Sequence, residues 1–406
     1  MDSLITAAAR ALSSGDPLSA LKHIALREDP PALALRGIAM AQLGDLPKAR
    51  DLLRRAGRAF GAREPMARAR CGVAEAEIAL VSRDLGKPME GLVAARETLE
   101  KLGDRANAAH ADYLEARRLL LIGRLDEAER GLRRIDVDML PKPSLTGYHL
   151  VEAGVAMRRI RSVPAREALR KALEAARMTG IPALIAEAER AADRFAATVA
   201  RLVGHEIDRA LVLEEIEELF NSDALVIDAC RNVVRAGEAA APLASRPVLF
   251  ALVRALAEAW PEDTSRETLL ARAFRARQAD DSHRARLRVE IGRLREAIGP
   301  LAEVSATERG FRLEPPQGRV VSVLAPPVEG DHGNVLALLA DGEAWSTSAL
   351  ALALGVSART VQRALEELSR DGKVESFGRG RACRWIAASV PGFPSNLLLP
   401  ASGPAS

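Results

Sequence analysis

Two stretches in the second half of the chain place apolar residues at helical spacing. Residues 247–260 carry five such residues on one face, and residues 282–298 carry four on a stripe whose other positions are rich in arginine. The nine residues are Leu249, Phe250, Val253, Leu256, Ala257, Leu287, Ile291, Leu294 and Ile298. This period predicts two helices, the first ended by Pro261. Residues 224–239 instead predict two short strands with a turn near Gly237, and residues 306–313 predict the end of a β-hairpin.

The first half of the chain repeats a pattern in which a small residue stands five positions after a turn. The strongest pairs are Gly15 with Ala20, Gly44 with Ala49 and Gly123 with Ala128, and the weaker pairs are Gly86 with Gly91 and Val163 with Ala168. Glycine ends a helix in a conformation that other residues resist, and an early alanine lets the next helix approach closely. The turns are 29 to 42 residues apart. We therefore predict an irregular array of helical hairpins over residues 1–200.

Two copies of this pattern resemble the tetratricopeptide repeat, although most of that family's large aromatic residues are missing. The matching small and apolar positions are Gly37, Gly44, Ala49 and Ala56 in one copy, and Ala116, Gly123, Ala128 and Leu132 in the other. The resemblance implies a curved scaffold that binds a peptide, a partner or its own chain. A structural and oligomerisation role is favoured over a sensory groove, because no convergent set of polar residues stands out.

Composition and charge narrow the class of protein. Hydrophobic residues make up 48% of the chain and charged residues 28%, which is enough apolar surface for folded cores. The net charge is only +3, but it is segregated: residues 201–241 carry nine acidic and four basic residues, whereas residues 266–297 carry nine arginines and five acids. We interpret residues 201–221 as an acidic connecting helix and the arginine-rich segment as a positive surface.

Residues 346–365 carry the most specific motif in the chain. Ala351, Gly355 and Val361 stand at the offsets of a helix-turn-helix, where the alanine lets the helices touch, the glycine makes the turn and the valine fills the angle between them. Leu350, Leu354, Val356 and Leu365 are predicted to complete a small core. A basic β-hairpin is predicted over residues 373–385. Residues 331–388 as a whole resemble the winged helix-turn-helix of DeoR-like regulators.

That resemblance implies which side chains would contact DNA. Ser357 would cap the recognition helix, and the wing would project Arg384 beside two further arginines. The expected DNA-binding residues of this unit are Ser357, Arg359, Thr360, Gln362, Arg363, Arg379 and Arg381. Their side chains suit base edges and phosphates.

Residues 222–316 resemble a second family, the OmpR-type effector domain that is shared by Streptomyces-type antibiotic regulators. The matching segments are 265–270, where Ser265 would cap a helix, 287–295 in the recognition helix and 309–313 in the wing. Glu290 departs from the family pattern. By this resemblance, arginines of the long helix would face the major groove or its phosphates, and an arginine of the wing would reach a minor groove. These residues are Arg284, Arg286, Arg288, Arg293 and Arg309.

No motif for catalysis or metal binding is found. The chain contains no GxxxxGKS/T, GxSxG or HExxH pattern, its three cysteines are far apart, and its six histidines are scattered. The run from Glu214 to Glu218 is interpreted as a solvated helix face. We therefore expect no catalytic residue, no cofactor and no metal site. The start of the chain lacks a signal-peptide pattern, and the long uncharged run after Trp385 is broken by prolines, so a cytoplasmic protein without a membrane partner is expected.

These observations together predict a mainly α-helical protein with a helical-hairpin array (1–200), a connecting helix (201–221), two small α+β winged-helix domains (222–316 and 331–388), a linker (317–330) with a short strand between residues 317 and 325, and a disordered tail (389–406). The predicted function is a bacterial DNA-binding transcriptional regulator, not an enzyme, whose partner is double-stranded DNA. RNA polymerase, a protein or a peptide would bind the repeats, or the repeats would make a homodimer. The alternatives are an interaction scaffold and a DNA-binding defence or accessory protein. The regulator hypothesis requires arginines that are not occupied by acidic neighbours.

Overall fold

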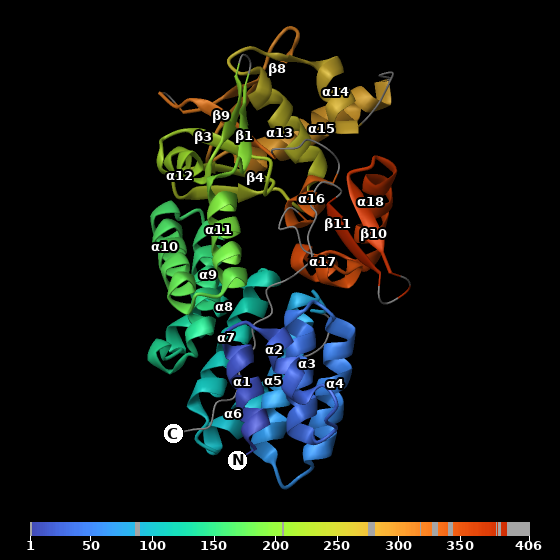
Figure 1. The fold of residues 1–406 in the computed structure, drawn as a ribbon. Helices are drawn as coiled ribbons and strands as arrows, with labels where there is room; N and C mark the ends of the chain where they lie inside the picture. The colour runs from blue at the N-terminus through green and yellow to red at the C-terminus, as the bar shows by residue number, and fades with distance from the viewer. Residues whose placement is uncertain are drawn as a thin grey trace. The chain divides into compact units, whose positions relative to one another are not determined.

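The computed structural model describes residues 2–85, 90–204, 207–274, 281–316, 318–326, 332–339, 344–378, 380 and 383–387. The chain is mainly α-helical with small β-sheets, as predicted (Figure 1). It divides into two compact units. The helical unit comprises residues 1–159, 163–194 and 334–406, and the sheet unit comprises residues 160–162 and 195–333.

The helical unit begins with consecutive helices that pack against their neighbours in sequence. Short turns connect most of them, and aspartate side chains cap several N-termini, as Asp16, Asp45 and Asp104 do for α2, α4 and α7. The helices are α1 (Ser3–Ser13), α2 (Pro17–Ile24), α3 (Pro30–Gln42), α4 (Leu46–Phe60), α5 (Pro65–Val81), α6 (Glu90–Lys101), α7 (Arg105–Leu121), α8 (Leu125–Arg134), the 3-10 turn η1 (Val137–Met139), α9 (Lys142–Arg158), α10 (Ser162–Thr179) and α11 (Pro182–Ala196).

The predicted glycine turns are confirmed at the three strongest copies. Gly15, Gly44 and Gly123 adopt positive φ angles of 75°, 86° and 79°. The alanines five positions later, Ala20, Ala49 and Ala128, are each 0% exposed. Each turn therefore lets a buried alanine bring the next helix close to its predecessor.

One of the two weaker copies is corrected. The turn before α10 has its positive φ, 55°, at Ile160, and the fully buried small residue is Ala165, so the predicted pair of Val163 and Ala168 is out of register by three residues. Gly86 lies outside the described residues. A copy that the sequence analysis missed joins Gly103, with φ 80°, to the buried Ala108.

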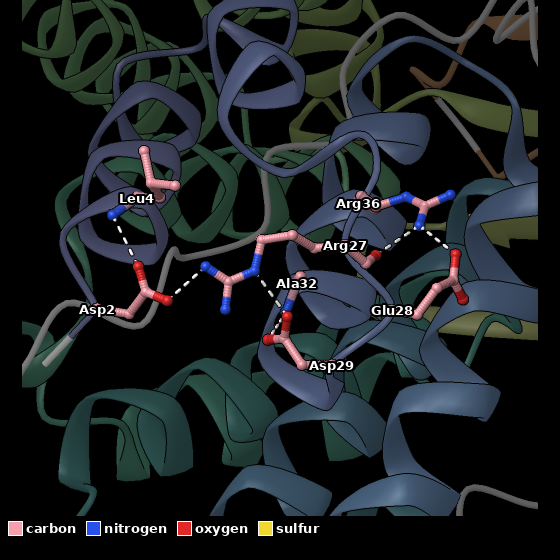
Figure 2. Close-up of polar contacts among 7 residues, drawn as sticks. All are labelled: Asp2, Leu4, Arg27, Glu28, Asp29, Ala32 and Arg36. Carbon is pink, nitrogen blue, oxygen red and sulfur yellow. Dashed lines mark hydrogen bonds and ion pairs between the residues drawn. The ribbon is translucent and has the colours of Figure 1, made fainter.

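A network of ion pairs connects the N-terminal end of α1 with the loop between α2 and α3 (Figure 2). Arg27, between α2 and α3, pairs with Asp2 before α1, and its Nε donates to Asp29 at 2.7 Å. These contacts hold the pKa values of both aspartates below their ordinary value. Arg36 donates to Glu28 at 2.8 Å and lowers the pKa of that carboxyl in the same way. The network ties the first two hairpins together at their polar ends.

The sheet unit contains a six-stranded sheet in the order β2-β1-β9-β3-β4-β5. Its strands are β1 (Ala200–Val203), β2 (Asp208–Leu211), β3 (Leu225–Asp228), β4 (Val233–Ala236), β5 (Ala239–Pro242) and β9 (Val321–Ala325). The β3–β9 pair is parallel, and the other neighbours are antiparallel. Gly237, with φ 58°, turns the chain between β4 and β5. The segment predicted as two strands, residues 224–239, therefore holds β3 and β4, and a further strand, β5, follows the turn from its last residue onward.

One predicted connection is wrong, and the other contains the strand that was predicted for it. Residues 201–221 are not one connecting helix, because β1 and β2 form a hairpin before α12 (Leu213–Asn221). Arg201 Nε donates to Asp208 across that hairpin at 2.9 Å, and β1 also pairs with the distant strand β9, a contact that the charge of the segment alone does not reveal. Residues 317–330 were predicted to be a linker with a short strand. That strand is β9, and it lies at the centre of the sheet between β1 and β3, with Val323, Leu324 and Ala325 almost completely buried.

The rest of the sheet unit follows the predicted order. It comprises α13 (Pro247–Ala259), β6 (Thr264–Ser265), α14 (Arg266–Phe274), α15 (Asp281–Ile298), β7 (Glu303–Ala306) and β8 (Gly310–Glu314). Ser265 caps α14 by accepting from the backbone of Thr268 at 3.1 Å, as predicted. The strands form a second sheet, β6-β8-β7, in which Gly310 is required because a Cβ there would lie 1.9 Å from the carbonyl oxygen of Thr264.

The helical unit also contains the last elements of the chain. They are α16 (Gly333–Leu339), α17 (Thr347–Leu354), α18 (Ala358–Arg370), β10 (Val374–Phe377) and β11 (Arg384–Ala387). Their core, centred on Trp345, is continuous with the core of α5 to α9. The Ser346 hydroxyl donates to the carbonyl of Arg83 at 3.3 Å, and the Arg83 guanidinium lies 5.3 Å from the centre of the Trp345 ring. Residues predicted as a separate domain thus pack on the helical hairpins.

None of the helices within the described ranges is long and apolar enough to span a membrane.

Candidate nucleic-acid interface

In the sheet unit, α15 presents its arginines away from the core. The predicted stripe of Leu287, Ile291, Leu294 and Ile298 is 0–2% exposed and packs against α13 and α14. Because these four positions face inward, the remaining positions of the helix face solvent. The predicted site residues on these positions are all exposed, namely Arg284, Arg286, Arg288 and Arg293.

These arginines differ in what they contact. Arg293 donates to Glu290 at 2.8 Å, so its charge is partly neutralised within the helix. The Arg286 guanidinium lies 4.6 Å from the ring centre of Phe274, a cation–π arrangement that leaves the positive charge in place. Arg288 makes no ion pair or hydrogen bond with the rest of the described chain. The regulator hypothesis requires arginines that are not paired with acidic side chains. Arg286 and Arg288 meet this requirement within the described chain, and Arg293 does not.

The hairpin tip beside α15 carries Arg309 between β7 and β8. Its side chain is 74% exposed and lies 3.5 Å from Asp263, a weak pair at the protein surface. Arg312 on β8 pairs with Glu314 at 3.0 Å. Arg309 is therefore the more exposed of these two arginines.

The sequence analysis did not identify the residues of α15 that lie on the side of the helix opposite its buried stripe. Opposite the buried stripe lie Ala285, Val289, Gly292 and the acidic Glu296, and Val289 is 54% exposed. A Cβ at Gly292 would meet nothing within 4 Å, so internal packing does not require glycine there. The signal was available, because positions halfway between the stripe residues on a helical period must face outward.

In the helical unit, the turn between α17 and α18 has the predicted geometry. Gly355 adopts φ 66° at the end of α17, Ala351 is 7% exposed and Val361 is 1% exposed. The Ser357 hydroxyl accepts from the backbone N–H of Thr360 at 3.1 Å and so caps α18. Val356 was predicted to join the core and does not, since it is 43% exposed.

The exposed face of α18 carries two arginines that have no acidic partner among the described residues. Arg359 and Arg363, one turn apart, are exposed and make no ion pair or hydrogen bond with the described part of the chain. Gln362 is less available, because its amide donates to Glu366 at 2.9 Å and its oxygen accepts from Thr347 at 3.3 Å. Thr360 bonds to the Ser357 hydroxyl at 2.8 Å. Arg359 and Arg363 are thus the side chains on this face that are available to bind an anion.

The hairpin of β10 and β11 lies next to α18. The predicted contact residues Arg379 and Arg381 lie outside the described residues. Arg384 was predicted to project from this hairpin, and that prediction is wrong: its Nε donates to the carbonyl of Ser82 at 3.2 Å. The side chain therefore anchors β11 to the end of α5.

A buried polar cluster in the helical unit joins α5, α7 and α9. His110 contacts the hydroxyl of Ser144 at 2.9 Å through Nδ1 and the carboxyl of Glu77 at 3.1 Å through Nε2. All three residues are at most 5% exposed, so a substrate has no access to the hydroxyl. The cluster satisfies buried polar groups between three helices, and its residues lie more than thirty positions apart, which gave no local signal.

The acidic run of α12 is also structural. Glu215 accepts from the backbone N–H of Val212 at 3.0 Å, which caps the helix, and Glu217 accepts from the backbone N–H of Ser162 at 2.7 Å. The pKa of Glu215 is lowered, first by that backbone hydrogen bond and then by Arg209. This run was predicted to be a solvated face, and two of its carboxylates instead bind backbone groups of the sheet unit.

No family model, curated protein or solved structure matches this chain. The interpretation of the two arginine faces therefore depends on their own geometry and charge.

Proposed function

We propose that the protein is a DNA-binding transcriptional regulator with two winged-helix units. In this proposal β3 to β8, within residues 222–316, form an OmpR-type unit, α16 to β11 form a DeoR-like unit, and the helical hairpins form a tetratricopeptide-like array. The order of helices and hairpins in each segment supports the assignment, as does the exposure of arginine on one helix of each.

The observation that carries the proposal is the exposed N-terminal half of α18. A helix that begins after a left-handed turn, with its cap bonded, presents its first turns and its positive dipole end to an anion. Arg359 and Arg363 stand on that face without acidic partners in the described chain. Guanidinium groups fork onto guanine edges or bridge phosphates, so this face suits the major groove.

The exposed face of α15 would also lie in the major groove, but its central side chains are apolar. Val289 and Ala285 would approach the groove floor, where an apolar contact to the thymine methyl group is available, and Arg286 and Arg288 would flank it. Arg309 would lie beside the duplex at the hairpin tip. The repeats would bind a partner, a second copy or an effector, and RNA polymerase is one such partner.

A mobility-shift experiment with purified full chain and random or genomic duplex tests the proposal at moderate salt. The wild type is expected to shift duplex DNA, and the Arg359→Ala, Arg363→Ala variant is expected to lose most of that shift. An equal loss with Arg63→Ala, Arg105→Ala, which removes the same charge from exposed positions in the hairpin array, would assign the effect to net charge. The absence of any shift by wild type would refute DNA binding.

A second candidate function is an interaction scaffold, and the packing of Trp345 and Ser346 on the helical hairpins favours it. In that case the α16–β11 segment would serve as part of the array. The same experiment separates the two functions, because a scaffold leaves duplex DNA unshifted. A DNA-binding defence or accessory protein would shift DNA without changing transcription, which a reporter assay distinguishes.

A further inference from the structure

A cavity of about 230 Å³ lies among α1, α3, α4, α5 and α7 of the helical unit. Its wall is mostly apolar and includes Ile5, Leu35, Phe60 and Val73. This volume is several times the roughly 30 Å³ that one water molecule occupies in the liquid, so side chains of an occupant would fit.

The polar groups at the edge of this cavity are already satisfied. Arg70 donates to Asp104 at 2.6 Å, and the Asn107 amide donates to both oxygens of the same carboxyl at 2.9 and 3.0 Å. Burial raises the pKa of the cavity-lining Cys71 thiol to about 12, so it is uncharged at neutral pH. The cavity therefore favours an apolar, uncharged occupant.

The chain carries a segment of that chemistry at its own end. Residues 388–406 lie outside the described residues and contain no charged side chain. They include Phe393 and three consecutive leucines, Leu397 to Leu399, between prolines. A run of three leucines exposed to water is unfavourable and promotes association, so cover by an apolar surface stabilises it.

The distance that this segment must bridge has two parts, one along α5 from Ser82 to the cavity and one of about 10 Å along β11 from Arg384 to Ala387. Arg384 on β11 binds the carbonyl of Ser82 at the C-terminal end of α5, and the cavity is lined by Ala67 to Ala74 near the other end. At a rise of 1.5 Å per residue these positions lie about 12 to 22 Å from Ser82. An extended chain from Ala387 spans about 20 Å to Phe393 and about 36 Å to Leu398. The segment is long enough to reach the cavity.

We propose that this cavity binds the chain's own C-terminal apolar segment, residues 393–399. A tether of about ten residues gives an effective concentration in the millimolar range, so a modest affinity suffices for occupancy. A competing peptide or ligand would have to exceed that concentration. The proposal is independent of DNA binding, because neither arginine face contributes to the cavity.

The test uses the full chain with a photoreactive residue, Phe393→p-benzoylphenylalanine. After irradiation at low protein concentration, digestion and mass spectrometry are expected to find Phe393 joined within one chain to residues 31–38 or 67–74. Ala34→Trp, which fills the cavity, should lower the yield of this product at least fivefold, whereas Ala106→Trp at an exposed position of α7 should not change it.

A second variant leaves the cavity intact, so that misfolding cannot explain a loss. Replacing Leu397, Leu398 and Leu399 by serine should also lower the yield at least fivefold. Products that join two chains would overturn the proposal in favour of exchange between copies. Products scattered over the surface, or a yield insensitive to the leucines, would overturn it altogether.

Discussion

Removing Arg359 and Arg363 together gives a quantitative test of the α18 face. Both side chains are exposed and have no ion pair or hydrogen bond with the described residues. The Arg359→Ala, Arg363→Ala variant should therefore keep its fold, with a change in unfolding free energy of about 0.5 kcal/mol or less. Its melting temperature should shift by less than about 2 °C.

The size of the effect follows from counterion release. Each arginine that neutralises a phosphate contributes about 0.9 to the slope of log affinity against log salt, so two contribute about 1.8. Between about 50 and 200 mM salt, a fourfold change, the wild type should lose about 12-fold more affinity than the variant. If one arginine contacts a base edge instead, the difference in slope falls to about 0.9 and specificity for one base pair is lost as well.

Fluorescence anisotropy with a labelled duplex selected from a random pool measures this slope at several salt concentrations. The Arg63→Ala, Arg105→Ala variant provides the control for net charge and should keep the wild-type slope. Equal slopes for the wild type and the α18 variant would refute the reasoning, as would a variant that melts far below the wild type.

Three further predictions concern other parts of the chain. Glu290→Gln should release Arg293, raise duplex affinity and steepen the slope of log affinity against log salt by about 0.9, as one added phosphate contact would, and anisotropy titrations at several salt concentrations measure it. Gly37→Ala should destabilise the protein by about 1 to 3 kcal/mol in urea unfolding, because the new Cβ would lie 2.8 Å from Leu53 Cγ, whereas Gly91→Ala, with nothing within 4 Å, should not destabilise it. Arg27→Met should return the pKa values of the two aspartates it contacts towards 3.8, as carboxyl NMR titration would show. Because the pKa values of Asp2 and Asp29 are lowered in the folded state, the ionised aspartates stabilise the fold above about pH 4, and this stabilisation is lost at lower pH. The variant lacks it, so its free energy of unfolding should fall less on acidification.

Much of the local structure could be predicted from the sequence because burial leaves a periodic trace. The stripe from Leu287 to Ile298 predicted a helix and its buried face, and both are found. Gly355 predicted a left-handed turn because few other residues adopt that conformation without strain, and Ser357 predicted a cap from its short hydroxyl side chain. Such features depend on residues within one or two turns of each other.

The errors arose where distant residues decide the outcome. Strand β9 becomes central only because β1 and β3, about a hundred residues earlier, pair with both its edges. Arg384 turns inward because a carbonyl 302 positions away accepts its hydrogen bond. The cluster of His110, Glu77 and Ser144 takes one residue from each of three helices. No spacing rule within one segment carries such information.

Hydrogen–deuterium exchange of the full chain with and without duplex DNA tests the central claim most directly. The account predicts slower exchange on DNA addition at residues 357–363 of α18 and along the exposed first turns of α15, with the hairpin array from α1 to α4 unchanged. Binding of DNA without protection at either helix would contradict it.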